Sequence, residues 1–166
     1  MTETKQQLII YTDGSSRGNP GPGGYGAILM FGNKRKELSA GYRLTTNNRM
    51  ELLGVITALE SLTKKQIPLT ICTDSQYIVK AVQEKWLDKW IRTNFAGGKK
   101  NKDLWLRFHV LSKDYHIIFK WVKGHADNPF NNRCDELATE AADGKDLLID
   151  DVYEKEVANV KGNIFG

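Results

Sequence analysis

The chain has 166 residues, a mass of 18.8 kDa and a net charge of +4, with 40% hydrophobic and 27% charged residues. This composition excludes a disordered chain, and the length predicts one domain with a single core. The first residues are polar, and no apolar run approaches the roughly 18 residues that a membrane helix needs. We therefore expect a cytoplasmic protein without a membrane contact.

The first half of the chain predicts three strands followed by a turn-rich connection. Leu8–Thr12 is a β-branched, apolar run that ends at the turn-forming pair Asp13-Gly14. Two further runs, Tyr25–Phe31 and Lys36–Leu44, are joined by Gly32-Asn33, which is typical of a tight hairpin. Three consecutive strands of this kind predict a meander.

The rest of the chain alternates between helical and strand patterns. Apolar spacing predicts an amphipathic helix over 48–64, and Leu69–Thr73 predicts a strand that ends at Asp74, with a new helix starting at Ser75. The later expected elements are a helix from Asp103, a strand over Ile117–Val122 and a core helix over Cys134–Ala141 that Gly144 closes. This order predicts a mixed sheet with helices packed on its faces. No pattern assigns residues 145–166.

The positive charge is concentrated in one segment. Residues 84–102 hold six basic and two acidic side chains, so the segment alone carries +4. Trp86, Trp90 and Phe95 lie among these cations, a combination that favours contact with a polyanion. Packing of an amphipathic helix is the alternative explanation for the aromatic residues. The two cysteines, Cys72 and Cys134, fall in apolar patterns and are expected to be buried, reduced thiols.

Four carboxylates occupy positions where chemistry is plausible. Ligands of α/β sheets bind beyond the carboxyl ends of strands, where Asp13 and Asp74 are expected. Three of these acids also have a structural explanation: Asp74 as a helix cap, Glu51 in a capping box with Asn48, and Asp135 in the first turn of a helix. If they converged to about 5 Å, each charged pair would repel by about 3 kcal/mol at an effective dielectric of 20, which requires a cation. Oxygen ligands favour magnesium or manganese.

Four ordered segments resemble a known family, the bacterial ribonucleases H of type 1 (ribonuclease HI). They are TDGSSRGNPGPGGYGAIL at 12–29, TTNNRMELLGVITALESL at 45–62, TDSQYIVKAV at 73–82 and WVKGHADNPFNNRCDELA at 121–138. The resemblance implies an α/β ribonuclease H-like fold, with a five-stranded mixed sheet and helices on both faces. It divides the chain into a domain over 1–144, with a basic handle at 84–102, and a tail over 145–166.

The resemblance also implies an activity and the residues that perform it. The implied reaction is endonucleolytic hydrolysis of the RNA strand of an RNA–DNA hybrid, giving 5'-phosphate and 3'-hydroxyl ends. Two Mg²⁺ ions about 3.5 to 4 Å apart would straddle the scissile phosphate, with Mn²⁺ as a substitute. By resemblance, Asp13, Glu51 and Asp74 are the core metal ligands, Asp135 is the fourth, and His125 is a proton shuttle in a mobile loop. The protein is expected to act as a monomer.

Implied substrate contacts lie around these carboxylates. The implied minor-groove contacts are Ser16, Asn47, Asn48 and Gln76. The implied pocket for a phosphate of the DNA strand consists of Asn19, Thr46 and Arg49. The implied aromatic contacts of the handle are Trp86 and Trp90. The chain departs from many relatives in having Ser16 in place of cysteine, and Phe130 and Asn132 in place of acids.

Three other functions fit part of the pattern. A DNA nuclease of the same fold would share the carboxylates without the amides of TTNNRMEL, and a catalytically silent hybrid-binding module would not need four acids. A phosphotransferase that uses DGSS as a phosphate loop would require a much longer, two-lobed chain.

Overall fold

The computed structural model describes residues 7–124 and 127–165 and contains one five-stranded sheet in the order β3-β2-β1-β4-β5. Its strands are β1 Leu8–Ser16, β2 Gly21–Phe31, β3 Lys34–Thr45, β4 Pro68–Thr73 and β5 His116–Trp121. The first three strands form an antiparallel meander, and β4 and β5 continue the sheet parallel to β1. The expected mixed sheet is therefore confirmed.

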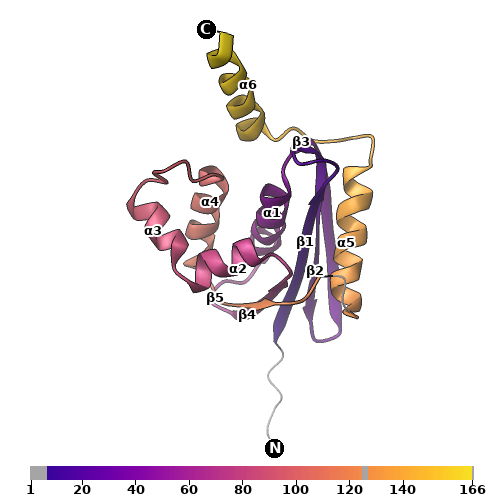
Figure 1. Ribbon diagram of the computed structural model, residues 1–166. Coiled ribbons are helices and arrows are strands. Elements are labelled where there is room, and N and C mark those ends of the chain that lie inside the picture. Colours follow the sequence, from indigo (N-terminus) through magenta and orange to yellow (C-terminus); the bar gives the residue numbers. More distant parts are fainter. Residues whose placement is uncertain (1–6, 125–126, 166) are drawn as a thin grey trace, which may run out of the picture.

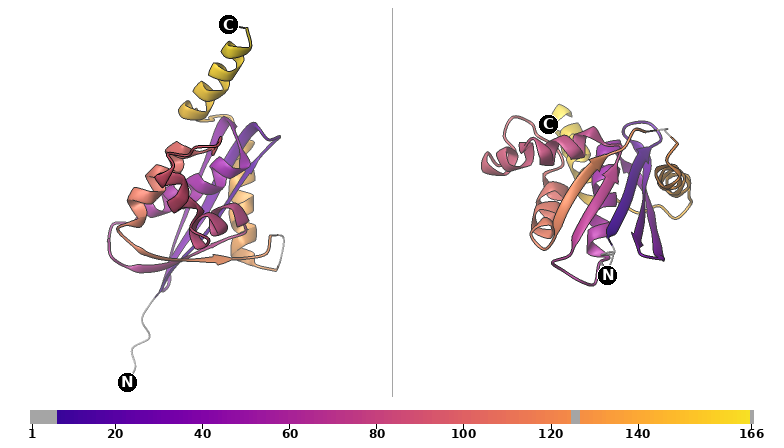
Figure 2. Two further views of the ribbon diagram at one scale, coloured as in Figure 1. Left: turned by 60° about the vertical axis from the view of Figure 1, so that its left-hand side comes forward. Right: turned by 90° about the horizontal axis from the view of Figure 1, so that it is seen from below.

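Helices cover both faces of this sheet, as expected. They are α1 Asn47–Glu60, α2 Gln76–Gln83, α3 Trp86–Arg92, α4 Lys102–Ser112, α5 Pro129–Ala142 and α6 Asp151–Phe165. Helix α5 lies alone on one face, whereas α1 and α4 lie on the other, and α2 and α3 extend outward beside α4 (Figure 1). The view from below shows α5 on the opposite side of the sheet from the remaining packed helices (Figure 2).

The apolar residues divide into two clusters separated by the sheet. The larger cluster packs α1, α2 and α4 against the inner strands, with Ile10, Ile56 and Ile71 fully buried. The smaller one joins Ile28 to Cys134 and Leu137 under α5. Burial of this much apolar surface holds the helices against the sheet and thereby fixes the ends of the strands. Both cysteines are free and buried, as expected.

The first strand is longer than the sequence indicated. A turn was expected at Asp13-Gly14, but β1 continues to Ser16 and pairs with β2 throughout, with Asp13 opposite Gly26. On the other edge of β1, the parallel pairing with β4 ends earlier, at Tyr11. Asp13 therefore lies inside the strand, at the point where β1 and β4 part.

The segment after α5 forms part of the structure. Leu148 pairs with β3, because its N–H donates to the Gly41 carbonyl oxygen at 2.8 Å and its carbonyl oxygen accepts from Arg43 at 2.9 Å. Helix α6 then projects away from the end of the sheet (Figures 1 and 2). Across the described residues, no helix has both the length and the apolar character needed to cross a membrane.

Candidate active site

Three carboxylates converge at the end of the sheet where β1 and β4 part. Asp13 comes from β1, Glu51 from α1 and Asp74 from the residue after β4, and one oxygen of each lies within 4.8 Å of the others. They open into a hollow of about 380 Å³ that is lined by Asp13, Gly14, Ser15, Asn47, Asn48, Glu51, Asp74, Ser75, Gln76, Tyr77, Asn131, Asn132 and Asp135. The structure thus brings all four acids singled out in the sequence to one cavity.

Glu51 reaches the strand because Gly14 has no side chain. A Cβ at Gly14 would lie 2.3 Å from the backbone nitrogen of Glu51, so only glycine permits this approach of α1 to β1. The helix cap is Thr46, whose hydroxyl accepts from the Arg49 N–H at 3.2 Å. The capping-box explanation of Glu51 is therefore wrong, because the helix starts two residues earlier than that box requires.

Asp74 is held at the junction of β4 and α2. The cap of α2 is Ser75, whose hydroxyl accepts from the Ile78 N–H at 3.2 Å, so the explanation of Asp74 as the cap is also wrong. The Trp121 indole donates to the Asp74 carbonyl oxygen at 3.2 Å. Gly124 lies against the side chain, since a Cβ there would stand 2.9 Å from Asp74 Oδ2.

Asp135 enters the hollow from α5, on the other face of the sheet. Asn128 caps that helix by accepting from the N–H groups of Phe130 and Asn131, so Asp135 lies in the second turn, beyond the first turn where the helix dipole favours acids. The structural explanations of Glu51, Asp74 and Asp135 are now excluded. His125 lies outside the described residues.

Burial and mutual repulsion make Asp13 and Glu51 hold protons more tightly than ordinary carboxyl groups do. Desolvation, followed by the charge of Asp74, raises the pKa of Asp13 to about 8. Desolvation, followed by the charges of Asp13 and Asp74, raises the pKa of Glu51 well above its ordinary value. Raised pKa values of buried, neighbouring carboxyl groups are typical of functional sites.

The donor set fits a hard divalent cation. Carboxylate oxygens are the ligands that Mg²⁺ and Mn²⁺ prefer, and the described part of the site offers neither thiolate nor imidazole. Glu51 Oε2 is buried without a hydrogen-bond partner among the described residues, although such an oxygen normally requires one. A cation between Asp13, Glu51 and Asp74 would satisfy this oxygen and relieve the repulsion.

A second hollow of about 460 Å³ adjoins the first and differs in character. It is lined by Asn19, Pro20, Thr46, Asn48, Tyr77, Trp90, Gly98, Lys99, Lys100, Asn101, Tyr153 and Glu156. Asn48 and Tyr77 line both hollows and so mark the ridge between them. Asn47 is held beside this ridge, because its side-chain oxygen accepts from the backbone N–H and the hydroxyl of Ser16 and its own N–H donates to Asn19.

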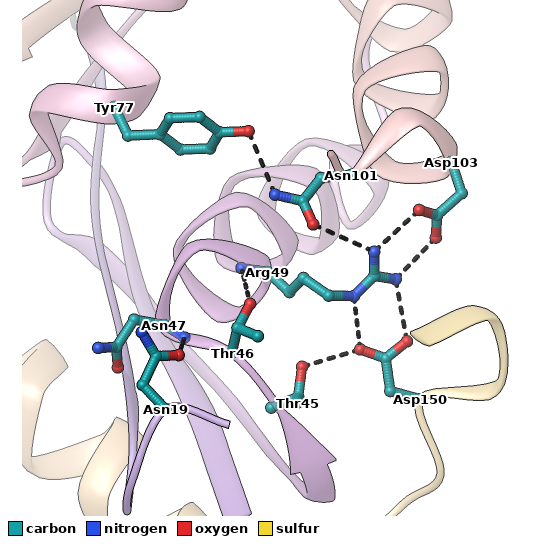
Figure 3. Close-up of polar contacts among 9 residues, drawn as sticks. All are labelled: Asn19, Thr45, Thr46, Asn47, Arg49, Tyr77, Asn101, Asp103 and Asp150. Atoms are coloured by element: carbon teal, nitrogen blue, oxygen red, sulfur yellow. Dashed lines mark hydrogen bonds and ion pairs between the residues drawn. The ribbon is translucent and has the colours of Figure 1, made fainter. Parts of the chain in front are cut away.

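Arg49 is placed differently from an exposed phosphate ligand. Its side chain is 2% exposed, and each nitrogen donates to a neighbouring side chain: Nε and Nη2 to Asp150, Nη1 and Nη2 to Asp103, and Nη1 to Asn101 (Figure 3). Asp150 also accepts from the Thr45 hydroxyl at 2.8 Å. Contact of Arg49 with a DNA phosphate would require one of these carboxylates to move.

The two tryptophans of the handle lie in different environments. Trp90 is 8% exposed and packs against Tyr77 and Trp105, whereas Trp86 is 38% exposed at the start of α3. Lys99 lies over the Trp90 ring, with Nζ 5.9 Å from the ring centroid. The handle thus combines a buried aromatic anchor with exposed cations next to the second hollow.

Sequence reasoning missed several residues that line the two hollows. Tyr77 was not among the expected site residues, but its hydroxyl accepts from the Trp105 indole at 2.7 Å and its side chain lines both hollows. Tyr153 and Glu156 belong to α6, for which the sequence carried no clear pattern. Asn131 was not considered, although it is buried and lines the first hollow.

Comparisons with known proteins agree with this geometry. A family model described as RNase H matches residues 5–143. Ribonuclease H of Lachnoclostridium phytofermentans is 50% identical over a region that covers 89% of this chain and 99% of that protein. Ribonuclease H of Syntrophus aciditrophicus is 48% identical, with coverage of 91% and 89%.

Solved structures of ribonucleases H superpose on this chain. LC9-RNase H1, described as a type 1 RNase H with the type 2 active-site motif, superposes with a TM-score of 0.75 at 27% identity, covering 86% of this chain and 74% of that one. LC11-RNase H1 in complex with RNA/DNA hybrid superposes with a TM-score of 0.62 at 27% identity, covering 82% and 97%.

Proposed function

The chain belongs to the RNase H family, and from this premise we propose that it is an endoribonuclease that hydrolyses the RNA strand of RNA–DNA hybrids. The products are a 5'-phosphate and a 3'-hydroxyl end. The observation that carries the proposal is the convergence of the Asp13, Glu51 and Asp74 oxygens within 4.8 Å, next to a ridge of amide side chains. One feature supplies the chemistry and the other the choice of substrate.

The family depends on divalent metal ions and uses a two-metal mechanism, and we propose Mg²⁺ as the ion of this chain. When bound, such ions lower the pKa of the attacking water and neutralise charge on the scissile phosphate and its leaving oxygen. Asp13, Glu51 and Asp74 would hold the ions, and Asp135 would assist from α5. The raised pKa values of Asp13 and Glu51 mean that these groups give up protons when the ions bind.

We assign the proton transfers of the reaction to Asp135 and His125. Asp135 orients the attacking water from its place in the hollow. His125, which follows β5 and precedes α5 in the sequence, takes up a proton from the attacking water and returns it to solvent, because imidazole changes charge near neutral pH. The proposed role of His125 rests on the family resemblance of the segment around it, and that of Asp135 on the same resemblance and on its place in the hollow.

The two adjoining hollows account for the recognition of a hybrid. The RNA strand lies in the first hollow, called the acidic hollow from here on, and the DNA strand lies in the second, called the basic hollow. The minor groove of the hybrid then faces the ridge of Asn48 and Tyr77. Amide groups of Asn47, Asn48 and Gln76, with the backbone at Ser16, read the 2'-hydroxyls because an amide offers a donor and an acceptor.

The DNA strand is gripped by the second hollow and the handle. Asn19 and Thr46 lie where they can hold a phosphate, and Trp90 lines the same surface, while the exposed ring of Trp86 extends it. A direct phosphate contact of Arg49 stays a prediction, since its donors are engaged by carboxylates in this structure. Its present contacts hold the start of α1, and with it Thr46, in place. The expected monomeric state and cytoplasmic location also stay predictions.

The proposal is tested by incubating the protein with matched RNA–DNA hybrid, duplex RNA and duplex DNA, with and without Mg²⁺. We expect Mg²⁺-dependent cutting of the RNA strand of the hybrid alone, with 5'-phosphate ends on the products. Cutting of duplex DNA would instead identify a DNA nuclease of the same fold. Hybrid binding without cutting would identify a silent binding module.

A further inference from the structure

The C-terminal helix contributes one wall of the basic hollow. Three parts of the chain form the other walls: the loop before β2 with Asn19, the start of α1 with Thr46, and the handle loop with Lys99 and Lys100. From α6 come Tyr153 and Glu156. Because the proposed function places the DNA strand in this hollow, we infer that α6 contacts that strand and that Glu156 weakens the contact; the inference rests on that function.

The start of α6 is anchored firmly enough to act as a wall. Asp150, which precedes the helix, is 8% exposed and binds Arg49 and Thr45 (Figure 3). One turn later Glu154 pairs with Arg43 of β3 at 2.8 Å. These contacts tie α6 both to the start of α1 and to the edge of the sheet, which are the elements that carry Thr46 and Arg43. The first turns of the helix therefore keep a fixed position relative to the hollow.

Tyr153 has the character of a strand-binding aromatic residue. Its ring packs on the Arg49 guanidinium, with Cζ 5.9 Å from the ring centroid, and the half-buried side chain still lines the hollow. A ring fixed in this way offers a flat surface to a sugar or base at little cost in conformational entropy. Tyr153 lines the same cavity as Trp90 of the handle, so a strand bound there would have aromatic residues of both α6 and the handle beside it.

Glu156 lines the same hollow as two cations. Among the described residues that line this cavity it is the one acid, whereas Lys99 and Lys100 are cationic, and all three side chains are exposed. A phosphate bound by the lysines would lie in the same cavity as the Glu156 carboxylate and be repelled by it. Glu156 therefore lowers the affinity for the DNA strand and reduces the net number of counterions released on binding.

The test compares charge changes at Glu156 with one at Glu140, an exposed residue of α5 that lines neither hollow. We expect KM for hybrid to fall in the order wild type, Glu156→Gln, Glu156→Lys, by about three- to tenfold overall, with kcat unaltered. The salt dependence of KM should steepen by about 0.7 to 0.9 in log–log slope for Glu156→Lys. Glu140→Lys, which makes the same change in net charge, should leave both quantities near the wild-type values.

The strand assignment is tested with hybrids that carry neutral methylphosphonate linkages in one strand. Neutral linkages in the DNA strand should abolish the effect of Glu156→Lys on hybrid binding, measured in EDTA, and linkages in the RNA strand should preserve it. Equal effects of Glu156→Lys and Glu140→Lys, or loss of the effect with a neutral RNA strand, would overturn the inference. Because the wild type must still cut hybrid in Mg²⁺, failure of the proposed function would be seen separately.

Tyr153 is tested by two substitutions with thermal unfolding as a check on the fold. Tyr153→Phe keeps the ring and should keep KM near the wild-type value, whereas Tyr153→Ala should raise KM by about five- to tenfold, consistent with the loss of one stacking contact. A value of KM unchanged in Tyr153→Ala, with the melting temperature preserved, would remove Tyr153 from the hybrid contact.

Discussion

The Arg49 guanidinium donates to both carboxylate oxygens of Asp150, from Nε to Oδ2 at 2.7 Å and from Nη2 to Oδ1 at 2.9 Å. The same cation pairs with Asp103 at 2.7 Å. One buried side chain thus joins the start of α1, the start of α4 and the residue before α6. These are the segments that border the basic hollow, so the network that stabilises them also shapes the proposed DNA-strand site.

Removing Asp150 should therefore destabilise the fold. Asp150→Ala leaves Arg49 buried with one carboxylate partner, and we expect the free energy of unfolding to fall by about 3 kcal/mol. The matched control is Asp143→Ala, which breaks an exposed pair with Arg17 and should cost about 1 kcal/mol or less. Urea unfolding of both variants measures the difference. Equal effects would mean that the buried network carries no special stability.

The metal-free protein should be less stable at high pH because of Asp13. Its folded pKa of about 8 lies above the unfolded value, so the folded state holds the extra proton between the two. Stability consequently falls as pH rises from about 4 through about 8. Asp13→Asn should flatten this slope and raise stability at neutral pH by about 1 to 3 kcal/mol. Thermal unfolding in EDTA across this range is the measurement, and a variant with the wild-type slope would contradict it.

The close approach at Gly14 should be essential for activity. In Gly14→Ala the new Cβ would meet the backbone of Glu51, which must shift away from Asp13, and we expect kcat to fall by about a hundredfold or more. Gly54→Ala, in the helix α1 that also carries Glu51, is the control, since the nearest contact of the new Cβ would be at an ordinary 3.4 Å. That variant should keep full activity and gain about 0.5 to 1 kcal/mol of stability. Comparable activities of the two variants would disprove the role of Gly14.

Lys99 and Lys100 should act on binding through phosphate contacts. Replacing both with glutamine should raise KM, with kcat preserved, and reduce the log–log salt slope by about 0.7 to 0.9 for each contact that is lost. The equivalent double change at Lys34 and Lys64, exposed residues that line neither hollow, keeps the net charge matched. A salt slope that is the same in both double variants would refute the assignment of the handle loop.

The sequence predicted the architecture and the four carboxylates, but the resemblance was needed to choose among their explanations. The sequence left open whether Asp74 and Glu51 cap their helices, because an acid and a hydroxyl accept equally well from the same N–H groups. The structure decides the question, since Ser75 and Thr46 perform the capping. Asp13 was expected after its strand because the apolar run stops at Thr12 and Asp13-Gly14 is a turn-forming pair. In the structure only the parallel pairing with β4 stops before this point, whereas the antiparallel pairing with β2 continues.

Contacts between distant segments were beyond the reach of local patterns. Asp150 is separated from Arg49 by 101 positions, and nothing near it in the chain indicated that a buried cation was its partner. Tyr77 was not identified as a site residue, because periodicity indicates which face of a helix is apolar and carries no information on which ring borders a cavity. The place of α6 beside the basic hollow likewise follows from tertiary contacts at Leu148, Asp150 and Glu154 alone.

The central claim is that Asp13, Glu51 and Asp74 perform the chemistry while other residues bind the hybrid, and Asp13→Asn tests it most directly. Cleavage of a hybrid in Mg²⁺ is measured together with binding of the same hybrid, with Asp143→Asn as an exposed control. The account predicts that cleavage by Asp13→Asn falls by a factor on the order of a thousand or more, with affinity within about threefold of wild type. Cleavage at a near-normal rate by this variant would contradict it.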